Sequence, residues 1–249
     1  MRKNYRVDHY TIVAPWEKQP LSRAQCAERA SVFLRSIAEV DERLVKLCTL
    51  GKSISKPVGS PISVEPKYIE QILRIHEGEP DLGYTLYVIH PDGAFKIIIE
   101  DGVYTDAELL VNEIMVEFYP HDNPMLFEFL RVDVLTKIVA AIKDVYNTPY
   151  VCVVSDSHYF DMCGVKGISP FVSWMLYLRK RMELLPALPK EVEVKEFGSD
   201  GTLIITAQEP FTIDKEDHVL IAGETNRRLE DVGMLAEFNP YRKSSGGYS

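Results

Sequence analysis

The chain has 249 residues, of which 46% are hydrophobic and 26% are charged, so it can bury a sizeable core. Its net charge of −9 at pH 7 argues against direct nucleic-acid binding, because phosphate contacts need a basic surface. The sequence contains no run of about 18 apolar residues, so no membrane-spanning helix is predicted. No apolar segment follows the basic N-terminus either, so we expect no secretory signal and a cytoplasmic location.

The first part of the chain predicts one strand, two helices and a β-hairpin. The expected elements are a strand over 7–14, a helix from about 23 to 50, a loop over 52–63, a helix over 66–76, and a hairpin over 84–99 folded at Asp92-Gly93. Ser22 is placed to cap the first helix, and Gly51 suits the position just after its end.

The second part of the chain predicts a similar series of elements. They are a strand over 111–118, a helix over 124–146, a short strand over 150–154, a helix over 170–183, a hairpin over 192–206 turned at Asp200-Gly201, and a final helix over 215–232. The helix over 170–183 is predicted from Trp174, Leu178 and Met182, which recur at steps of four residues.

The order strand, long helix, short helix and Asp-Gly hairpin therefore occurs twice. This order predicts an α/β protein of the α+β type, with an antiparallel or mixed sheet or sheets, helices packed on one face and two pseudo-repeated halves, 5–108 and 109–238. We expect a single domain over 5–238. Residues 239–249 contain little that could be buried, so we expect a disordered tail there.

The negative charge is concentrated in one stretch, because no lysine or arginine occurs between Lys96 and Arg131. The acidic residues of this interval are Glu100, Asp101, Asp106, Glu108, Glu113, Glu117, Asp122 and Glu128, whereas the rest of the chain has 29 acidic and 28 basic residues. In a strand, Glu113 and Glu117 lie on one face and the apolar residues between them lie on the other. A basic partner would explain the unbalanced carboxylates, and so would a solvated face that keeps the protein soluble.

Two local motifs raise the question of an enzyme. Asp156, His158 and Asp161 follow an apolar strand and could hold a metal ion for hydrolysis, although they are also ordinary loop residues. Gly51-Lys52-Ser53 looks like the end of a phosphate-binding loop, but the upstream glycine is missing and the tripeptide is predicted to end a helix. Nucleotide binding is therefore not expected, and no motif indicates a cofactor.

Segments spread over most of the chain resemble the immunity protein 52 family, which are antitoxins of bacterial polymorphic-toxin systems. They are residues 22–30, 50–53, 82–84, 172–178, 185–192, 201–205, 209–211 and 217–219. The segment Val-Ser-Trp-Met-Leu-Tyr-Leu over 172–178 is similar to a Gly-Trp-Met-Thr-Tyr-Leu segment of the family, with Ser173 where glycine is usual. The order and spacing of these segments agree from about residue 20 to 232.

The resemblance implies a stoichiometric inhibitor of a toxin with a restriction-endonuclease-like nuclease domain. Such toxins are delivered by a type VI secretion system, and the immunity protein protects the producing cell without a cofactor, a metal or a reaction. We expect the toxin's basic surface to contact Glu100, Asp101, Asp106, Glu108, Glu113, Glu117 and Asp122. The alternatives are a metal-dependent hydrolase that uses Asp156, His158 and Asp161, and a general adaptor or scaffold protein.

Overall fold

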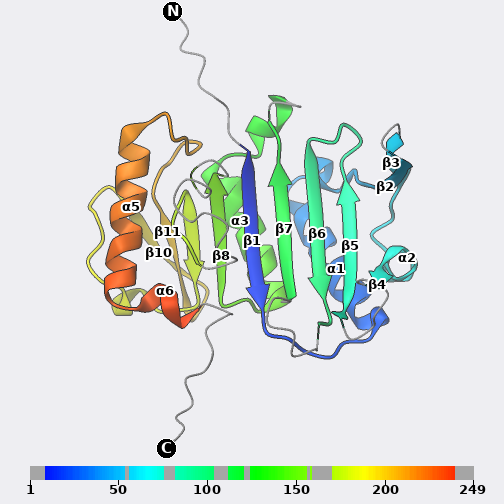
Figure 1. Cartoon of the computed structure of the whole chain (residues 1–249), viewed down its shortest axis with the longest axis horizontal. Coiled ribbons are helices and arrows are strands. Elements are labelled where there is room, and N and C mark those ends of the chain that lie inside the picture. Colours follow the sequence, from blue (N-terminus) through cyan, green and yellow to red (C-terminus); the bar gives the residue numbers. More distant parts are fainter. Residues whose placement is uncertain are drawn as a thin grey trace, which may run out of the picture.

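The backbone is organised around one antiparallel sheet (Figure 1). The computed structural model describes residues 9–53, 56–75, 82–103, 112–120, 124–155, 158 and 170–238, without the side chains of 52–57. Within these residues the sheet has eleven strands: β1 (Tyr10–Trp16), β2 (Cys48–Ser53), β3 (Lys56–Pro61), β4 (Arg74–Ile75), β5 (Tyr84–Ile89), β6 (Phe95–Asp101), β7 (Asn112–Phe118), β8 (Tyr150–Ser155), β9 (Met175–Leu178), β10 (Glu193–Phe197) and β11 (Gly201–Ile205). Their order is β10-β11-β9-β8-β1-β7-β6-β5-β2-β3, and β4 pairs with β5.

β1 lies in the middle of the sheet, with β7 on one side and β8 on the other. Its sequence, Tyr-Thr-Ile-Val-Ala-Pro-Trp, is rich in β-branched and aromatic residues, which suit a pleated and partly buried backbone. Tyr10, Ile12 and Trp16 alternate along the strand and belong to the main hydrophobic core. The strand predicted here is confirmed, and β1 joins all the strands on its two sides into one sheet.

Both predicted hairpins are confirmed, as β5–β6 and β10–β11, although Gly201 begins β11 and pairs with Phe197, so the second turn lies before it and not at Asp200-Gly201. In the first, Gly93 has a φ of 79°, which suits a residue without a side chain, and Asp92 accepts a hydrogen bond from the backbone N–H of Ala94. In the second, the residue with positive φ is Gly198, at 75°. Gly201 is needed for a different reason, because a Cβ there would lie 2.3 Å from Cε2 of Tyr177.

The helices cover both faces of the sheet, and not one face as the sequence predicted. The helices are α1 (Arg23–Val40), α2 (Pro66–Ile72), α3 (Val132–Tyr146), α5 (Glu216–Asp231) and α6 (Met234–Glu237). α1 and α3 pack on one face, over the core that contains Ile12 and Val153. α5 and α6 lie against the opposite face, over alternate residues of β8, β9 and β11 such as Cys152 and Ile204 (Figure 1). No described helix is long and apolar enough to cross a membrane.

The first helix is shorter than predicted, because it ends at Val40 and not near residue 50. Its start is confirmed by a capping box, in which Ser22 and Gln25 satisfy each other's backbone N–H groups. At its end, the Asp41 carboxylate accepts hydrogen bonds from the backbone and guanidinium of Arg43 and so caps a 3-10 turn, Glu42–Val45. The helical spacing of apolar residues continues past Val40 in the sequence, because the residues that follow are also buried. The α-helix nevertheless ends there, and β2 begins at Cys48.

Two further predictions were wrong in the type of element. Residues 170–183 form β9 and a 3-10 turn, Met182–Leu184, and part of the predicted loop over 52–63 forms β3. Residues 170–178 are buried at every position, because hydrophobic clusters lie on both faces of β9. A strand covered on both faces has no polar alternation, so its sequence cannot be distinguished from a buried helix. Gly51-Lys52-Ser53 lies in β2 and so does not follow a helix.

The sheet order does not confirm the two pseudo-repeated halves. β2, the strand after α1, lies near an edge and pairs with β5. β8, the strand after α3, pairs with β1 in the middle of the sheet. Corresponding strands of the two halves therefore occupy different positions, although both halves contribute to one sheet.

Replacing Ile12 by alanine tests the central position of β1. Ile12 is fully buried, so Ile12→Ala should lower the free energy of unfolding by about 2–5 kcal/mol through lost burial and a new cavity. Val32 is 41% exposed on α1, and Val32→Ala should change that free energy by about 0.5 kcal/mol or less. Urea unfolding followed by circular dichroism measures both, and equal effects of the two substitutions would contradict this placement of β1.

Candidate functional site

The candidate site is the part of the sheet that α5 and α6 leave uncovered. On β6 and β7, side chains that pack toward α1 and α3 alternate with side chains that point the other way. Within the described ranges no helix covers the second set over β1, β5, β6 and β7 (Figure 1). We call this surface the open sheet face. Its residues are Thr11, Val13, Pro15, Thr85, Tyr87, Ile89, Lys96, Ile98, Glu100, Glu113, Met115 and Glu117.

Strand pairing arranges the open sheet face in three rows. Across the strands, the first row is Thr11, Glu117, Lys96 and Ile89, the second is Val13, Met115, Ile98 and Tyr87, and the third is Pro15, Glu113, Glu100 and Thr85. An apolar row thus lies between two rows with carboxylates. Glu113 and Glu117 share this face, as their even spacing predicted, and the apolar residues between and beyond them, Ile114, Val116 and Phe118, lie in the core on the other face.

The first row is balanced in charge. The Lys96 ammonium lies 3.3 Å from Oε2 of Glu117 and donates a hydrogen bond of 3.1 Å to the Tyr119 hydroxyl. That hydroxyl in turn donates to Oε2 of Glu117 at 2.6 Å, and the Lys96 ammonium lies 4.3 Å from the centre of the Tyr119 ring. Glu117 is therefore held in a fixed network, although its side chain remains 22% exposed.

The third row contains two carboxylates in direct opposition. Glu113 on β7 pairs with Glu100 on β6, and on its other side Glu113 pairs with Pro15 of β1. Glu113 is only 8% exposed, and its Oε2 has no hydrogen-bond partner among the described residues. Burial, together with the neighbouring charge of Glu100, raises the pKa of the Glu113 carboxyl to about 7.

Asp101 does not belong to the open sheet face, although the sequence grouped it with Glu100. It follows Glu100 directly in β6 and therefore points to the opposite face, where it is 1% exposed. Its Oδ1 lies 3.1 Å from the Arg29 guanidinium and accepts hydrogen bonds from Nε1 of Trp16 and the backbone N–H of Gly102. Burial raises the pKa of this carboxyl, and Arg29 acts in the opposite direction.

Three acids of the acidic stretch are therefore paired with basic residues from other parts of the chain. Besides the pairs of Asp101 and Glu117, Glu128 lies 2.8 Å from Arg43. The local excess of carboxylates in the sequence therefore overstates the negative charge that is left for a partner. The other predicted contact residues, Asp106, Glu108 and Asp122, lie outside the described residues.

Of the three predicted metal-binding residues, only His158 lies among the described residues. His158 is buried, with Nδ1 3.1 Å from the Ser173 hydroxyl and its ring packed against Phe171 and Phe211. Asp156 and Asp161 lie outside the described ranges. Among the residues that the structure does describe, no group of three His, Cys, Asp or Glu side chains is placed to hold a metal ion.

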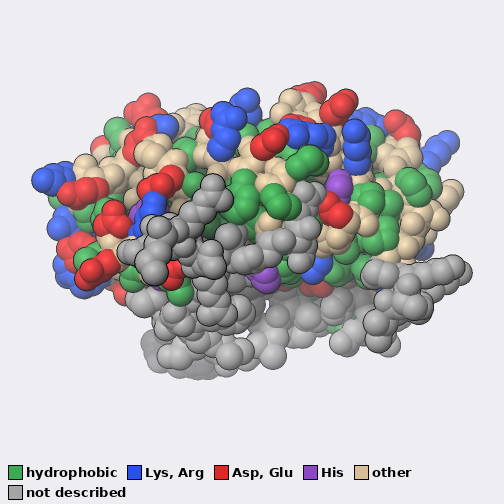
Figure 2. All heavy atoms as spheres, turned by 90° about the horizontal axis from the view of Figure 1, so that it is seen from above, with side chains coloured by type: hydrophobic (Ala, Val, Ile, Leu, Met, Phe, Trp, Pro, Cys, Tyr) green, Lys and Arg blue, Asp and Glu red, His purple; other side chains and the backbone are tan. Residues whose placement is uncertain are grey.

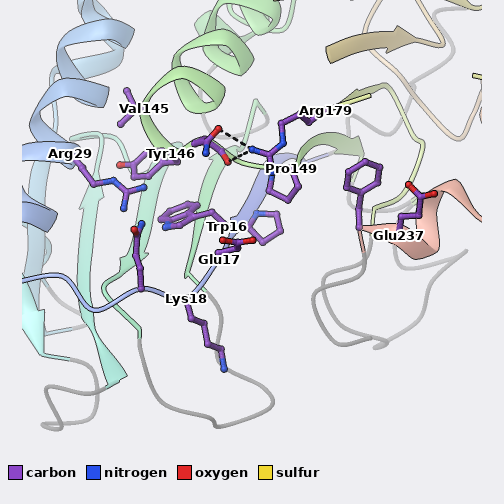
Figure 3. A pocket seen from close by; sticks show the side chains of 13 residues that line it. Trp16, Glu17, Lys18, Arg29, Val145, Tyr146, Pro149, Arg179 and Glu237 are labelled. Atoms are coloured by element: carbon purple, nitrogen blue, oxygen red, sulfur yellow. Dashed lines mark hydrogen bonds between the residues drawn. The ribbon is translucent and has the colours of Figure 1, made fainter. Parts of the chain in front are cut away.

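A hollow of about 700 Å³ lies at the end of β1, and no pattern in the sequence pointed to it (Figure 3). Trp16 and Tyr146 stack there with ring centres 4.3 Å apart, and the Arg29 guanidinium lies over both rings. Arg179 donates hydrogen bonds to the backbone and side-chain oxygens of Asn147. The charged residues of the described lining include Glu17, Lys18 and Glu237.

Other parts of the described surface have mixed charge. Seen from the upper end of the strands in Figure 1, acidic and basic side chains alternate along the rim (Figure 2). The carboxylate row of the open sheet face differs from this rim because its two acids lie directly opposite each other on neighbouring strands.

Replacing Glu113 by glutamine tests the environment of this carboxyl. The folded protein keeps the Glu113 proton up to about pH 7, whereas the unfolded chain loses it near pH 4.5, so this group lowers stability as pH rises between these values. Glu113→Gln should therefore gain up to about 3 kcal/mol in free energy of unfolding relative to the wild type as pH rises across this range. Urea unfolding over a series of pH values measures the difference. A constant difference would contradict a buried, unpaired Glu113.

Comparison with known proteins gives one family match. The family model described as Immunity protein 52 matches residues 8–238. Among solved structures, Pseudomonas aeruginosa T6SS protein PA0821 is similar with a TM-score of 0.45 and 11% sequence identity, covering 93% of this chain and 72% of that one. A likeness at this score is too weak to support an argument about function, and no curated protein matches. The family match spans most of the chain, so the protein belongs to the Immunity protein 52 family.

Proposed function

We propose that this protein neutralises a cognate toxin by binding it with the open sheet face. Membership of an immunity protein family supports the binding of a toxin. The observation that favours this particular surface is the pair of opposed carboxylates, Glu100 and Glu113, on the face of β6 and β7 that no described helix covers. Protein surfaces that expose a mixture of apolar and charged groups on rigid strands can bind a partner without a large change in shape.

The three rows have the composition of a protein interface. In such interfaces an apolar centre is buried and polar groups surround it. Here Val13, Met115 and Ile98 occupy the middle row, and carboxylates lie in the rows on either side. The apolar row would supply most of the buried area, whereas the carboxylates would select the partner and its orientation.

We further propose that the toxin is a nuclease, as the family resemblance implies. A nuclease binds phosphates through lysine and arginine, and an acidic surface can cover those groups or lie beside them. Charge complementarity would also accelerate the encounter of the two proteins. Delivery of the toxin by a type VI secretion system, with protection of the producing cell, belongs to the same proposal. Binding of this kind needs neither a cofactor nor a reaction.

The metal-dependent hydrolase remains a prediction without support from the structure. His158 is in contact with two aromatic rings and a serine, and the two aspartates of that prediction lie outside the described residues. A general adaptor role is likewise favoured by no particular contact. Binding of the toxin is therefore the function to test first.

Reversing two charges on the open sheet face tests the proposed surface. The double variant Glu100→Lys with Glu117→Lys should slow association with the nuclease domain of the cognate toxin by about tenfold or more at low salt, and should weaken the salt dependence. The matched control is Glu28→Lys with Glu39→Lys, which makes the same charge change at exposed positions of α1, behind the sheet. Stopped-flow or surface-plasmon-resonance kinetics measure the association rates.

The two double variants separate the possible outcomes. If the control slows association as much as the open-face variant, net charge alone is responsible and the proposed surface is wrong. If neither variant has an effect, the toxin binds elsewhere. If the wild-type protein does not bind the toxin domain at all, the proposed function itself fails.

A further inference from the structure

Lys96, Glu117 and Tyr119 form a connected polar group in and beside the first row of the open sheet face. Lys96 on β6 pairs directly with Glu117 on β7, and Tyr119 follows just after the end of β7. The Tyr119 hydroxyl donates a hydrogen bond of 2.6 Å to Oε2 of Glu117, and the Lys96 ammonium donates one of 3.1 Å to that hydroxyl. Each of the three side chains is therefore held by the other two.

Tyr119 is itself fixed in place. Its backbone N–H donates a hydrogen bond of 2.8 Å to the carbonyl of Ala94, and its ring packs against the ring of His9 with centres 4.4 Å apart. Burial, together with the hydrogen bond to Glu117, raises the pKa of the Tyr119 hydroxyl to about 12. The hydroxyl therefore keeps its proton at neutral pH and remains a donor to Glu117.

The ion pair still has one acceptor and one donor to offer a partner. Both contacts of Glu117 are made by Oε2, whereas Oε1 accepts no hydrogen bond from the described residues and is not fully buried. The Lys96 ammonium has three N–H groups, and its contacts with Tyr119 and Glu117 leave a third. The side chains of Lys96 and Glu117 are 23% and 22% exposed, so a partner can reach both.

The chemistry of this pair favours a neutral ligand. A cation that approached Glu117 would also meet the Lys96 ammonium, which lies 3.3 Å from Oε2, and an anion that approached Lys96 would meet Glu117. A primary carboxamide carries an N–H and a C=O side by side, so it can donate to Glu117 and accept from Lys96 at once. In a trans peptide group the N–H and the C=O point in opposite directions, so one peptide group cannot reach both.

We propose that Lys96 and Glu117 bind the carboxamide of one asparagine or glutamine side chain of the toxin, and that Tyr119 is the positioning residue for this contact. The inference rests on the proposed function, because it names a group that the same surface recognises. It also gives specificity. A toxin with a charged side chain at this point would bring a like charge against Lys96 or Glu117, which costs binding free energy.

The experiment measures dissociation from a catalytically inactive nuclease domain of the cognate toxin by surface plasmon resonance at pH 7. Lys96→Met with Glu117→Met removes the donor and the acceptor at similar side-chain size, and it leaves the net charge unchanged. The association rate should therefore stay within about twofold. The dissociation rate should rise about thirtyfold, which is roughly fivefold for each lost hydrogen bond.

A second pair of substitutions separates a neutral ligand from a charged one. Lys96→Gln with Glu117→Gln removes both charges but keeps a donor and an acceptor, so the dissociation rate should stay within about fivefold of the wild type. The matched control is Arg35→Met with Glu65→Met, which removes an exposed ion pair of 3.3 Å between α1 and the start of α2. That control should leave both rates unchanged.

The positioning role of Tyr119 has its own test. Tyr119→Phe should raise the dissociation rate of the otherwise wild-type protein about fivefold, because Glu117 loses the hydroxyl that orients it. In the background of the two methionine substitutions, Tyr119→Phe should have no further effect, because its influence passes through Lys96 and Glu117. An equal effect of Tyr119→Phe in both backgrounds would show a merely structural role and contradict the proposal.

The outcomes are distinct from those of the proposed function. If the wild type does not bind the toxin domain, both proposals fail. If it binds and the methionine pair dissociates no faster, the inference is overturned and the binding proposal stands. If the glutamine pair dissociates as fast as the methionine pair, the contact needs charge and a neutral ligand is wrong. Should the methionine pair fail to fold by circular dichroism, Tyr119→Phe decides, since an unchanged dissociation rate in that variant overturns the inference.

Discussion

The antiparallel pairing of β1 with both β7 and β8 is the constraint on which the rest of the structure depends. It joins the strands on its two sides into one sheet, and it fixes the phase of every neighbouring strand. Because side chains alternate along a strand, this phase decides which residues of β6 and β7 join the core and which reach the other face. If the pairing register shifted by one residue, Glu113 and Glu117 would lie in the core under α1 and α3. Placing these carboxylates among apolar side chains is costly, so the observed register is strongly favoured.

The uneven cover of the sheet follows from the sequence at its two ends. On β8 and β9 both faces are apolar, and α5 and α6 provide the second layer. On β6 and β7 the second face carries the partly exposed Lys96, Glu100 and Glu117, which would be costly to bury beneath a helix. The same sheet thus has a fully packed part and a part in which charged groups remain on the surface. The proposed toxin contact uses the second part, and the first gives it a rigid support.

Much of this could be predicted from local patterns, and the failures have physical causes. The Asp92-Gly93 hairpin and the shared face of Glu113 and Glu117 depend only on turn chemistry and on alternation, so they were predicted correctly. β9 was taken for a helix because a strand covered on both faces shows no alternation. Alternation alone could have separated Asp101 from Glu100. Its ion pair with Arg29 could not be foreseen, because 72 residues separate the two in the sequence.

The central claim is that the toxin covers the open sheet face and not the helical side of the sheet. Carboxyl-specific labelling of the free protein and of its complex with the toxin domain, followed by mass spectrometry, tests it most directly. The account predicts that Glu100 and Glu117 become protected in the complex, while Glu28 and Glu39 on α1 remain as reactive as before. Protection of the two residues on α1, with unchanged labelling of Glu100 and Glu117, would contradict it.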